Sequence, residues 1–170
     1  LSYRIIPRKM KYVSVKMKSS HLVYSGKIRK PSLKLSYKGI PLKAGTDYTV
    51  SKATAKNVGT GTVEITGKGN FSEKRTVTYR IVPKTPSITK TKALRGKKIY
   101  VRWKTKKNQV SGYQVAYSVR KSFKSGKVMK VGKKSVKKTF KVKKAKKKYY
   151  VRVRTYKTVK GKKIYSSWSK

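Results

Sequence analysis

The sequence has few of the groups that carry catalytic or metal chemistry. Its 170 residues include no cysteine, one histidine and three acidic residues, Asp47, Glu64 and Glu73. Without cysteine there is neither a disulfide framework nor a thiolate metal site. Catalysis needs a converging acid, base and nucleophile, so the sequence predicts a protein that is not an enzyme. We also expect no metal site and no cofactor, because three scattered carboxylates do not form a ligand cluster.

Long apolar runs are missing as well. No stretch approaches the roughly 20 apolar residues that a membrane-spanning helix needs. The opening segment, LSYRIIPRKMKYVSVKMK, lacks the apolar core of a signal peptide. If the protein is exported, we therefore expect its signal to lie upstream of this sequence.

Basic residues dominate the charged residues of the sequence. Fifty Lys and Arg residues give a net charge of +47, and forty of them are Lys. Residues 1–83 carry 18 bases and all three acids, whereas residues 84–170 carry 32 bases and no acid. Lysine is a hydrated point charge without the planar, bidentate group of arginine, which favours a diffuse polyanion over one specific phosphate. Because like charges at this density repel one another, we expect an anionic partner to offset them.

The apolar residues alternate with polar ones. This period of two occurs in KYVSVKM (11–17), KKIYVRW (97–103) and GYQVAYS (112–118), with glycine-rich turn signals between such segments. It predicts an all-β protein of two tandem antiparallel β-sandwich domains. We interpret GTGTVEITGKGN (59–70) as two hairpin turns, because strands flank its glycines where a phosphate-binding loop would need a helix. His21 is expected in a loop.

A short repeat indicates the domain boundaries. YRIIP at 3–7 recurs as YRIVP at 79–83, which predicts tandem modules. Each copy has the alternation of a last strand and ends in a proline, which cannot donate to a sheet ladder. The predicted divisions are 1–7, the tail of a preceding repeat; 8–83, the first sandwich; 84–87, a linker; and 88–170, the second sandwich.

Residues 86–170 resemble a fibronectin type III domain. The resemblance rests on PSITKTKAL, on IYVRW, on GYQVAYS, on YYVRVRTY and on the closing KGKKIYSSWSK. It implies that Trp103 is the buried tryptophan of the second strand. It also implies that Tyr149 occupies the corner position, where a tyrosine hydroxyl bonds back to the preceding backbone.

Residues 24–83 resemble a bacterial Ig-like repeat. The segments that carry this resemblance are YSGKIRKPSLKLSYKG, PLKAGTDYTV, NVGTGTVEITGKGNF and TVTYRIVP. Both resemblances are to secreted and cell-wall proteins of Gram-positive bacteria. They imply a structural or adhesion role in a protein that is secreted or attached to the wall, and we expect a monomer. Within the first module, Asp47 is expected to accept backbone hydrogen bonds in a turn.

Lysine runs in the last third form the predicted binding site. We expect an anionic cell-wall polymer such as teichoic acid, or an acidic glycan, as the partner. A nucleic acid held by the same lysines is one alternative, although the sequence has no recognition helix and no stacking motif. A passive stalk of a larger wall hydrolase is another. The predicted polyanion-binding residues are Lys138, Lys141, Lys143, Lys144, Lys146, Lys147, Lys148, Arg152 and Arg154.

Overall fold

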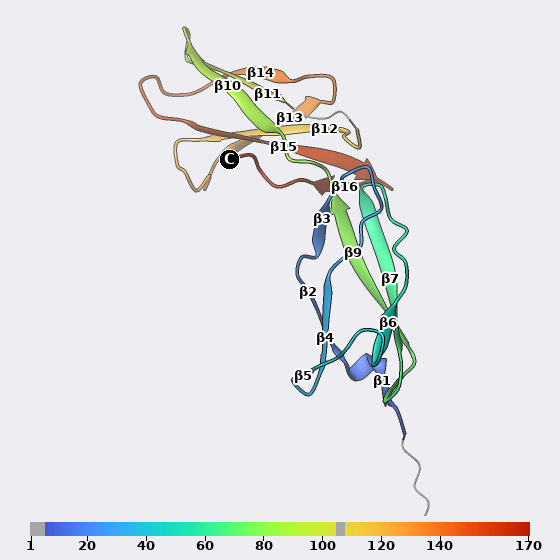
Figure 1. Ribbon diagram of the computed structural model, residues 1–170. Helices are drawn as coiled ribbons and strands as arrows, with labels where there is room; N and C mark the ends of the chain where they lie inside the picture. The colour runs from blue at the N-terminus through green and yellow to red at the C-terminus, as the bar shows by residue number, and fades with distance from the viewer. Residues whose placement is uncertain (1–5, 105–107) are drawn as a thin grey trace, which may run out of the picture. The chain divides into compact units, whose positions relative to one another are not determined.

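The computed structural model describes residues 6–104 and 108–170. The chain divides into two compact units, Leu1–Ile81 and Val82–Lys170. Both units are built from β-strands, and the described residues contain a single short 3₁₀ turn, Met10–Tyr12, as their helical element (Figure 1). The predicted all-β class with β-sandwich domains is therefore confirmed. Residues 1–5 of the predicted preceding repeat lie outside the described residues.

The first unit contains short edge strands around two long central ones. Its sheets have the orders β2-β4-β5 and β3-β9-β7-β6, and β1 pairs with β8 in parallel. Met10, Val13, Leu35, Tyr48 and Ile65 form its buried core. The strands are β1 (Arg8–Lys9), β2 (Ser14–Met17), β3 (His21–Val23), β4 (Leu33–Tyr37), β5 (Ile40–Pro41), β6 (Tyr48–Val50), β7 (Gly59–Gly67), β8 (Phe71–Ser72) and β9 (Lys74–Val82).

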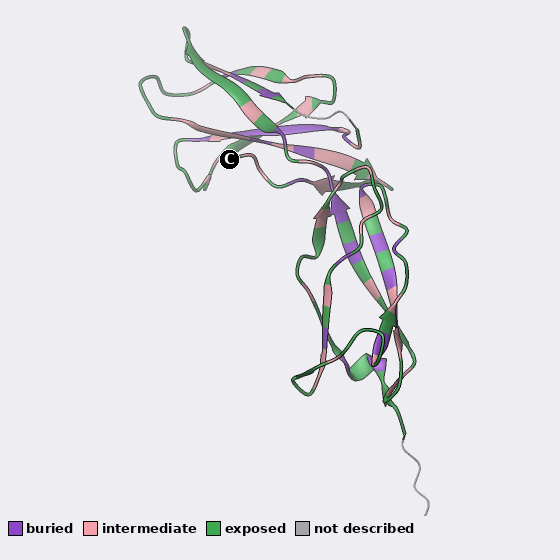
Figure 2. Ribbon diagram, in the orientation of Figure 1, coloured by how far each residue is buried: buried purple, intermediate pink, exposed green. Residues whose placement is uncertain are grey.

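Buried and exposed residues alternate along β7 and β9, as expected for strands with one face on the core and the other in solvent. Val63 and Ile65 are buried on β7 while Glu64 between them is half-exposed, and Tyr79 and Ile81 are buried on β9. Figure 2 shows this alternation along both strands. Successive side chains of a strand point to opposite faces, so the apolar set faces the core and the polar set faces solvent.

Two expectations about the first unit were wrong. His21 is the first residue of β3 and does not lie in a loop. GTGTVEITGKGN contains one hairpin turn, not two, because Gly59–Gly67 is continuous strand. Gly61 lies opposite Tyr79, and a Cβ at Gly61 would stand 2.5 Å from a ring carbon of that tyrosine. Glycine is needed there so that the ring can cross the strand, not for a turn.

The three acidic residues all have structural partners. The Lys43 backbone N–H donates to Asp47 Oδ2 at 2.7 Å, which confirms the predicted role of Asp47 in its turn. The other two carboxylates form exposed ion pairs, Lys74–Glu64 at 2.9 Å and Lys9–Glu73 at 2.8 Å. Exposed pairs of this kind add little stability. All three carboxylates lie in the first unit, and the second unit has none.

The second unit is a sandwich of a three-stranded and a four-stranded sheet. The sheet orders are β10-β11-β14 and β13-β12-β15-β16, and every pairing within them is antiparallel. The two layers can be followed in Figure 1. The strands are β10 (Ser87–Leu94), β11 (Lys98–Lys104), β12 (Gly112–Ser118), β13 (Lys127–Gly132), β14 (Lys137–Lys141), β15 (Tyr150–Val159) and β16 (Lys162–Tyr165).

The core of the second unit is centred on Trp103. Only 1% of this side chain is exposed, and its ring meets the ring of Tyr113 edge-on at a centroid distance of 5.4 Å. Val101, Val115 and Val153 are fully buried beside it. The inward orientation that the period of two predicts for β11 and β12 is therefore confirmed, as is the burial of Trp103.

Tyr149 occupies the corner that the resemblance implied. Its hydroxyl donates to the Lys144 carbonyl oxygen at 3.2 Å and accepts from the Lys144 backbone N–H at 3.3 Å. Because Tyr149 immediately precedes β15, this pair of hydrogen bonds ties the loop 142–149 back to the start of the strand. A buried tryptophan, a tyrosine corner and a three-on-four sandwich together describe a fibronectin type III-like fold.

Replacing Tyr149 by phenylalanine is expected to lower the free energy of unfolding of the second unit by about 1 kcal/mol, because both hydrogen bonds to the loop are lost. Urea unfolding followed by tryptophan fluorescence measures this change, since both tryptophans lie in the second unit. Tyr100→Phe, at a solvent-side position of β11, serves as the control. An equal loss in both variants would contradict the structural role of the corner.

Candidate polyanion-binding surface

The nine predicted binding residues do not lie on one face. Lys138 and Lys141 belong to β14, and five lysines follow in the loop 142–149. Arg152 and Arg154 belong to β15, which is part of the other sheet. The structure thus brings the loop lysines together with β14 and places the two arginines in a different layer.

Lys138 and Lys141 point to opposite faces of β14. Lys138 pairs with Val101 and is half-buried, so it belongs to the side of the strand that carries Phe140. Lys141 pairs with Lys98, and both are exposed. Side chains three positions apart on a strand face opposite ways, which separates two residues that the lysine run alone puts in one patch.

The solvent-side face of the β10-β11-β14 sheet carries a dense group of bases, which we name the outer basic face. All of its members are exposed, and they alternate along each strand with inward-facing residues. Bases on β10 and β11 were missed by the sequence reasoning, which concentrated on lysine runs. The outer basic face consists of Lys90, Lys92, Lys98, Arg102, Lys104, Lys137 and Lys141.

The strand register places like charges directly opposite one another on this face. Arg102 on β11 pairs with Lys90 on β10 and with Lys137 on β14, so three cations form one row across the sheet. Lys98 and Lys141 form a second such pair. Like charges at directly opposed positions destabilise a sheet. No carboxylate exists anywhere in residues 84–170 to neutralise them.

The loop 142–149 extends the outer basic face at one end. The Val142 backbone N–H donates to the Lys97 carbonyl oxygen at 2.8 Å, which joins the loop to the β10–β11 turn. Five lysines of this loop are exposed: Lys143, Lys144, Lys146, Lys147 and Lys148. The ammonium of Lys148 also lies 5.4 Å from the centroid of the Tyr150 ring.

Arg152 and Arg154 take part in a ladder of stacked side chains. The Arg152 guanidinium carbon lies 3.9 Å from the ring centroid of Phe123 and 4.4 Å from that of Trp168. For Arg154 the distances are 4.0 Å to Tyr165 and 4.3 Å to Trp168. Each guanidinium therefore stands between two aromatic rings, and Trp168 is shared by both. We call these five side chains the arginine ladder.

The surroundings of the ladder are less polar than those of the exposed lysines. Burial is the main cause that lowers the pKa of both Arg152 and Arg154 below the ordinary arginine value, and for Arg154 the nearby charge of Arg152 acts in the same direction. Arg154 Nε also donates to Gln114 Oε1 at 2.8 Å. The ring contacts of both guanidinium groups, and the Nε hydrogen bond of Arg154, are thus made within the unit.

Residues 166–169 hold Trp168 in place by hydrogen bonds with β15. The Val153 backbone N–H donates to Ser169 Oγ at 2.9 Å, and the Thr155 backbone N–H donates to Ser166 Oγ at 3.0 Å. The Ser166 and Ser169 backbone N–H groups donate to the Thr155 and Val153 carbonyl oxygens at 3.0 and 2.8 Å. The serines of YSSWSK therefore hold the backbone on either side of the tryptophan.

Other kinds of site are not found in the part of the chain that the structure describes. No group of three or more His, Cys, Asp or Glu side chains is placed to hold a metal ion there. None of the helical segments within the described ranges is long and apolar enough to cross a bilayer. The outer basic face and the adjoining loop remain the candidate binding surface.

The fold and the surface together define the class of protein. It has two β-sandwich units, and one sheet face of the second unit carries basic residues and no acidic residue. No protein-family model matches the sequence, and no curated protein matches it significantly. Among solved structures, the chain is similar to the crystal structure of chicken CNTN1 FN1-FN3 domains, with 14% sequence identity and a TM-score of 0.47. The match covers 81% of this chain, and 60% of that chain.

Proposed function

We propose that the protein is a non-catalytic structural and adhesion segment whose second unit binds an anionic polymer. The row Lys90–Arg102–Lys137 carries the proposal, because it opposes three cations across a sheet in a unit without a single acid. Such a row costs stability unless anions lie over it. The arrangement supports a polyanion partner more strongly than net charge alone does.

The shape of the face favours a polymer. Neighbouring strands lie about 4.8 Å apart, and alternate residues along a strand about 6.7 Å apart, so the cations form a two-dimensional array. A chain with regularly spaced phosphates or carboxylates can contact several of them at once and release its counterions. Teichoic acid and acidic glycans have this chemistry, and both agree with a secreted or wall-associated protein.

Within this proposal, the exposed lysines make the main contact. Lys141 and the lysines of the loop 142–149 retain their predicted role and are joined by the outer basic face. Lys138 contributes less because it is half-buried on the inner side of β14. Arg152 and Arg154 contribute less because rings cover their guanidinium faces.

The proposal is tested by reversing charge within the central row. The double variant Arg102→Glu with Lys137→Glu is expected to weaken binding of purified teichoic acid by roughly tenfold or more at 0.15 M salt, a change of about 1.4 kcal/mol or more. Its salt dependence should also be shallower, since fewer counterions are released. Isothermal titration calorimetry over a range of salt concentrations measures both effects.

The first unit offers a matched control. Lys16 and Lys34 are exposed and directly opposed on β2 and β4, so Lys16→Glu with Lys34→Glu changes charge by the same amount in the same geometry. We expect this variant to retain affinity within about twofold. Equal losses in the two variants would reject the outer basic face as the binding surface. Circular dichroism confirms that both variants are folded.

Parallel titrations with duplex DNA and a sulfated glycan distinguish the adhesion role from the two alternatives, nucleic-acid binding and a passive stalk. Retention of DNA alone at 0.15 M salt would favour the nucleic-acid alternative. Loss of all polymers together near that salt, where charges are screened beyond about 8 Å, would favour the passive stalk. Retention of teichoic acid or the glycan supports the proposed adhesion role and identifies its polymer.

A further inference from the structure

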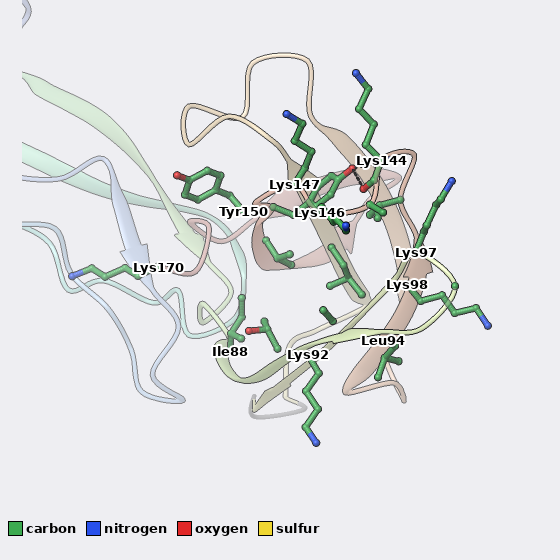
Figure 3. Close-up of a pocket in the computed structure, with 18 residues that line it drawn as sticks. Ile88, Lys92, Leu94, Lys97, Lys98, Lys144, Lys146, Lys147, Tyr150 and Lys170 are labelled. Atoms are coloured by element: carbon green, nitrogen blue, oxygen red, sulfur yellow. Dashed lines mark hydrogen bonds between the residues drawn. The ribbon is translucent and has the colours of Figure 1, made fainter.

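A cleft of about 780 Å³ opens at one end of the second unit (Figure 3). Residues along β10, the start of β11, the loop 142–149, the start of β15 and Lys170 line it. Its volume lies within the range of about 300–1,000 Å³ that is usual for small-molecule sites.

Aliphatic side chains form much of the cleft lining. Ile88, Ile99, Val142 and Val151 are half-buried, pack against the core around Trp103, and expose their remaining surface to the cleft. Leu94 adds a largely exposed side chain, 43% accessible. Aliphatic surface left open to water favours a ligand that can cover it.

Lysines surround this aliphatic lining, seven in all. In Figure 3 the side chains of Lys97, Lys144 and Lys147 lead away from the cleft, with their nitrogens at the outer ends. Such lysines cover apolar surface with their methylene stems while the ammonium groups remain in water. The flexible stems can turn an ammonium toward an anion bound at the mouth of the cleft.

The backbone holds two of these lysines in an uncommon conformation. Lys97 has φ of +54° and Lys146 has φ of +53°, the left-handed region that residues other than glycine seldom adopt. They belong to two different segments of the lining, the β10–β11 turn and the loop 142–149. Positive φ values are usual in tight turns, and six other described non-glycine residues have them, so these two values fix the turns that border the cleft.

The chemistry of the lining selects the class of ligand. Polyphosphates and teichoic acids have no apolar segment to cover the aliphatic side chains. A peptide would place backbone N–H and C=O groups against these aliphatic side chains, which can neither accept nor donate a hydrogen bond. An alkyl chain makes no such demand, and an anionic head group attached to it can meet the lysines.

We propose that this cleft binds a single-chain anionic amphiphile, with its alkyl chain against the aliphatic lining and its phosphate or carboxylate head among the lysine ammonium groups. The cleft shares Lys92, Lys98 and lysines of the loop 142–149 with the polymer-binding surface proposed above, but its aliphatic lining is not part of that surface, and the tests below rest on that lining. The row Arg102–Lys137 used to test polymer binding lies outside the residues that line the cleft.

The test is the dependence of affinity on chain length. Butyl, hexyl, octyl and decyl phosphate are titrated into the full chain by calorimetry below their micelle concentrations, with inorganic phosphate as the head-group reference. We expect affinity to rise by about fourfold for each methylene buried, which corresponds to about 0.8 kcal/mol. No rise with chain length in the unmodified protein would overturn the proposal.

A variant that fills the cleft tests its location. Ala145 is exposed and lines the cleft, so Ala145→Trp adds an indole there without changing charge or core. It should abolish the chain-length dependence of alkyl phosphate binding. Val119→Trp adds the same indole at an exposed position outside the lining, and it should bind alkyl phosphates like the unmodified protein. Persistence of the chain-length dependence in Ala145→Trp would overturn the proposal.

A second variant tests the location of the site if circular dichroism shows that Ala145→Trp is unfolded. Leu94→Ser removes an exposed aliphatic side chain of the lining and is expected to weaken decyl phosphate binding at least threefold. Its control, Val128→Ser, removes an exposed aliphatic side chain of β13 and should have no effect. Equal affinities in these two variants would reject the site. The polymer proposal is tested with Arg102→Glu and Lys137→Glu, and the cleft proposal with Ala145→Trp and Leu94→Ser. Either proposal can therefore be rejected while the other stands.

Discussion

Replacing Trp103 by alanine is expected to lower the free energy of unfolding of the second unit by about 3–5 kcal/mol. The side chain is 1% exposed, stacks edge-on against Tyr113, and lies among the largest group of buried residues in the unit. Its removal leaves a cavity between the two sheets that the neighbouring valines cannot fill without moving strands. Because domain stabilities are only about 5–15 kcal/mol, the loss approaches complete unfolding of this unit.

Urea unfolding followed by the fluorescence of Trp168 measures this loss. Trp168 is the remaining tryptophan after the substitution and lies in the same unit, so the signal is specific for it. Val128→Ala on β13 is the control, because that side chain is 52% exposed and should change stability by less than about 0.5 kcal/mol. A loss below about 1 kcal/mol for Trp103→Ala would contradict the core described here.

Replacing Trp168 by alanine is expected to lower the free energy of unfolding of the second unit by roughly 2–4 kcal/mol. The indole is shared by two guanidinium groups, at 4.4 Å from Arg152 and 4.3 Å from Arg154. Without it, two neighbouring cations keep their partial burial and lose a ring that stabilises both. Trp103 fluorescence follows the unfolding of this variant.

Conservative substitutions separate stacking from simple packing. Trp168→Phe keeps a ring with a weaker attraction for cations, so we expect an intermediate loss of about 1–2 kcal/mol. Arg152→Lys keeps the charge but removes the planar group that stacks between Phe123 and Trp168, so stability should fall while polymer affinity stays nearly constant. A larger effect of Arg152→Lys on polymer affinity than on stability would show that the arginine is a binding residue.

These predictions divide the basic residues of the second unit into two groups. The arginines of the ladder have aromatic partners and stabilise the outer side of the four-stranded sheet. The exposed lysines and Arg102 lie around the three-stranded sheet, and no acid in the unit is available to pair with them. Net charge alone cannot separate these groups, because every base in either group adds one positive charge to the total of +47.

Much of the fold could be predicted from the sequence because strand alternation is a local property. The period of two in KKIYVRW places Val101 and Trp103 on one side and Lys98 and Arg102 on the other, and the structure agrees. His21 and the glycines of 59–67 were misplaced for a physical reason. Gly61 is required by the ring of Tyr79, a residue of another strand, and the local sequence does not contain that contact.

The sequence by itself determined the all-β class, the inward set of apolar residues and the absence of acids after residue 83, and its resemblance to a fibronectin type III domain implied the corner role of Tyr149. The tertiary structure alone decided which cations face one another. Register pairs Arg102 with both Lys90 and Lys137, separates Lys138 from Lys141, and joins the loop 142–149 to the β10–β11 turn. Alternation depends on neighbours along the chain, whereas pairing depends on hydrogen bonds between strands distant in sequence.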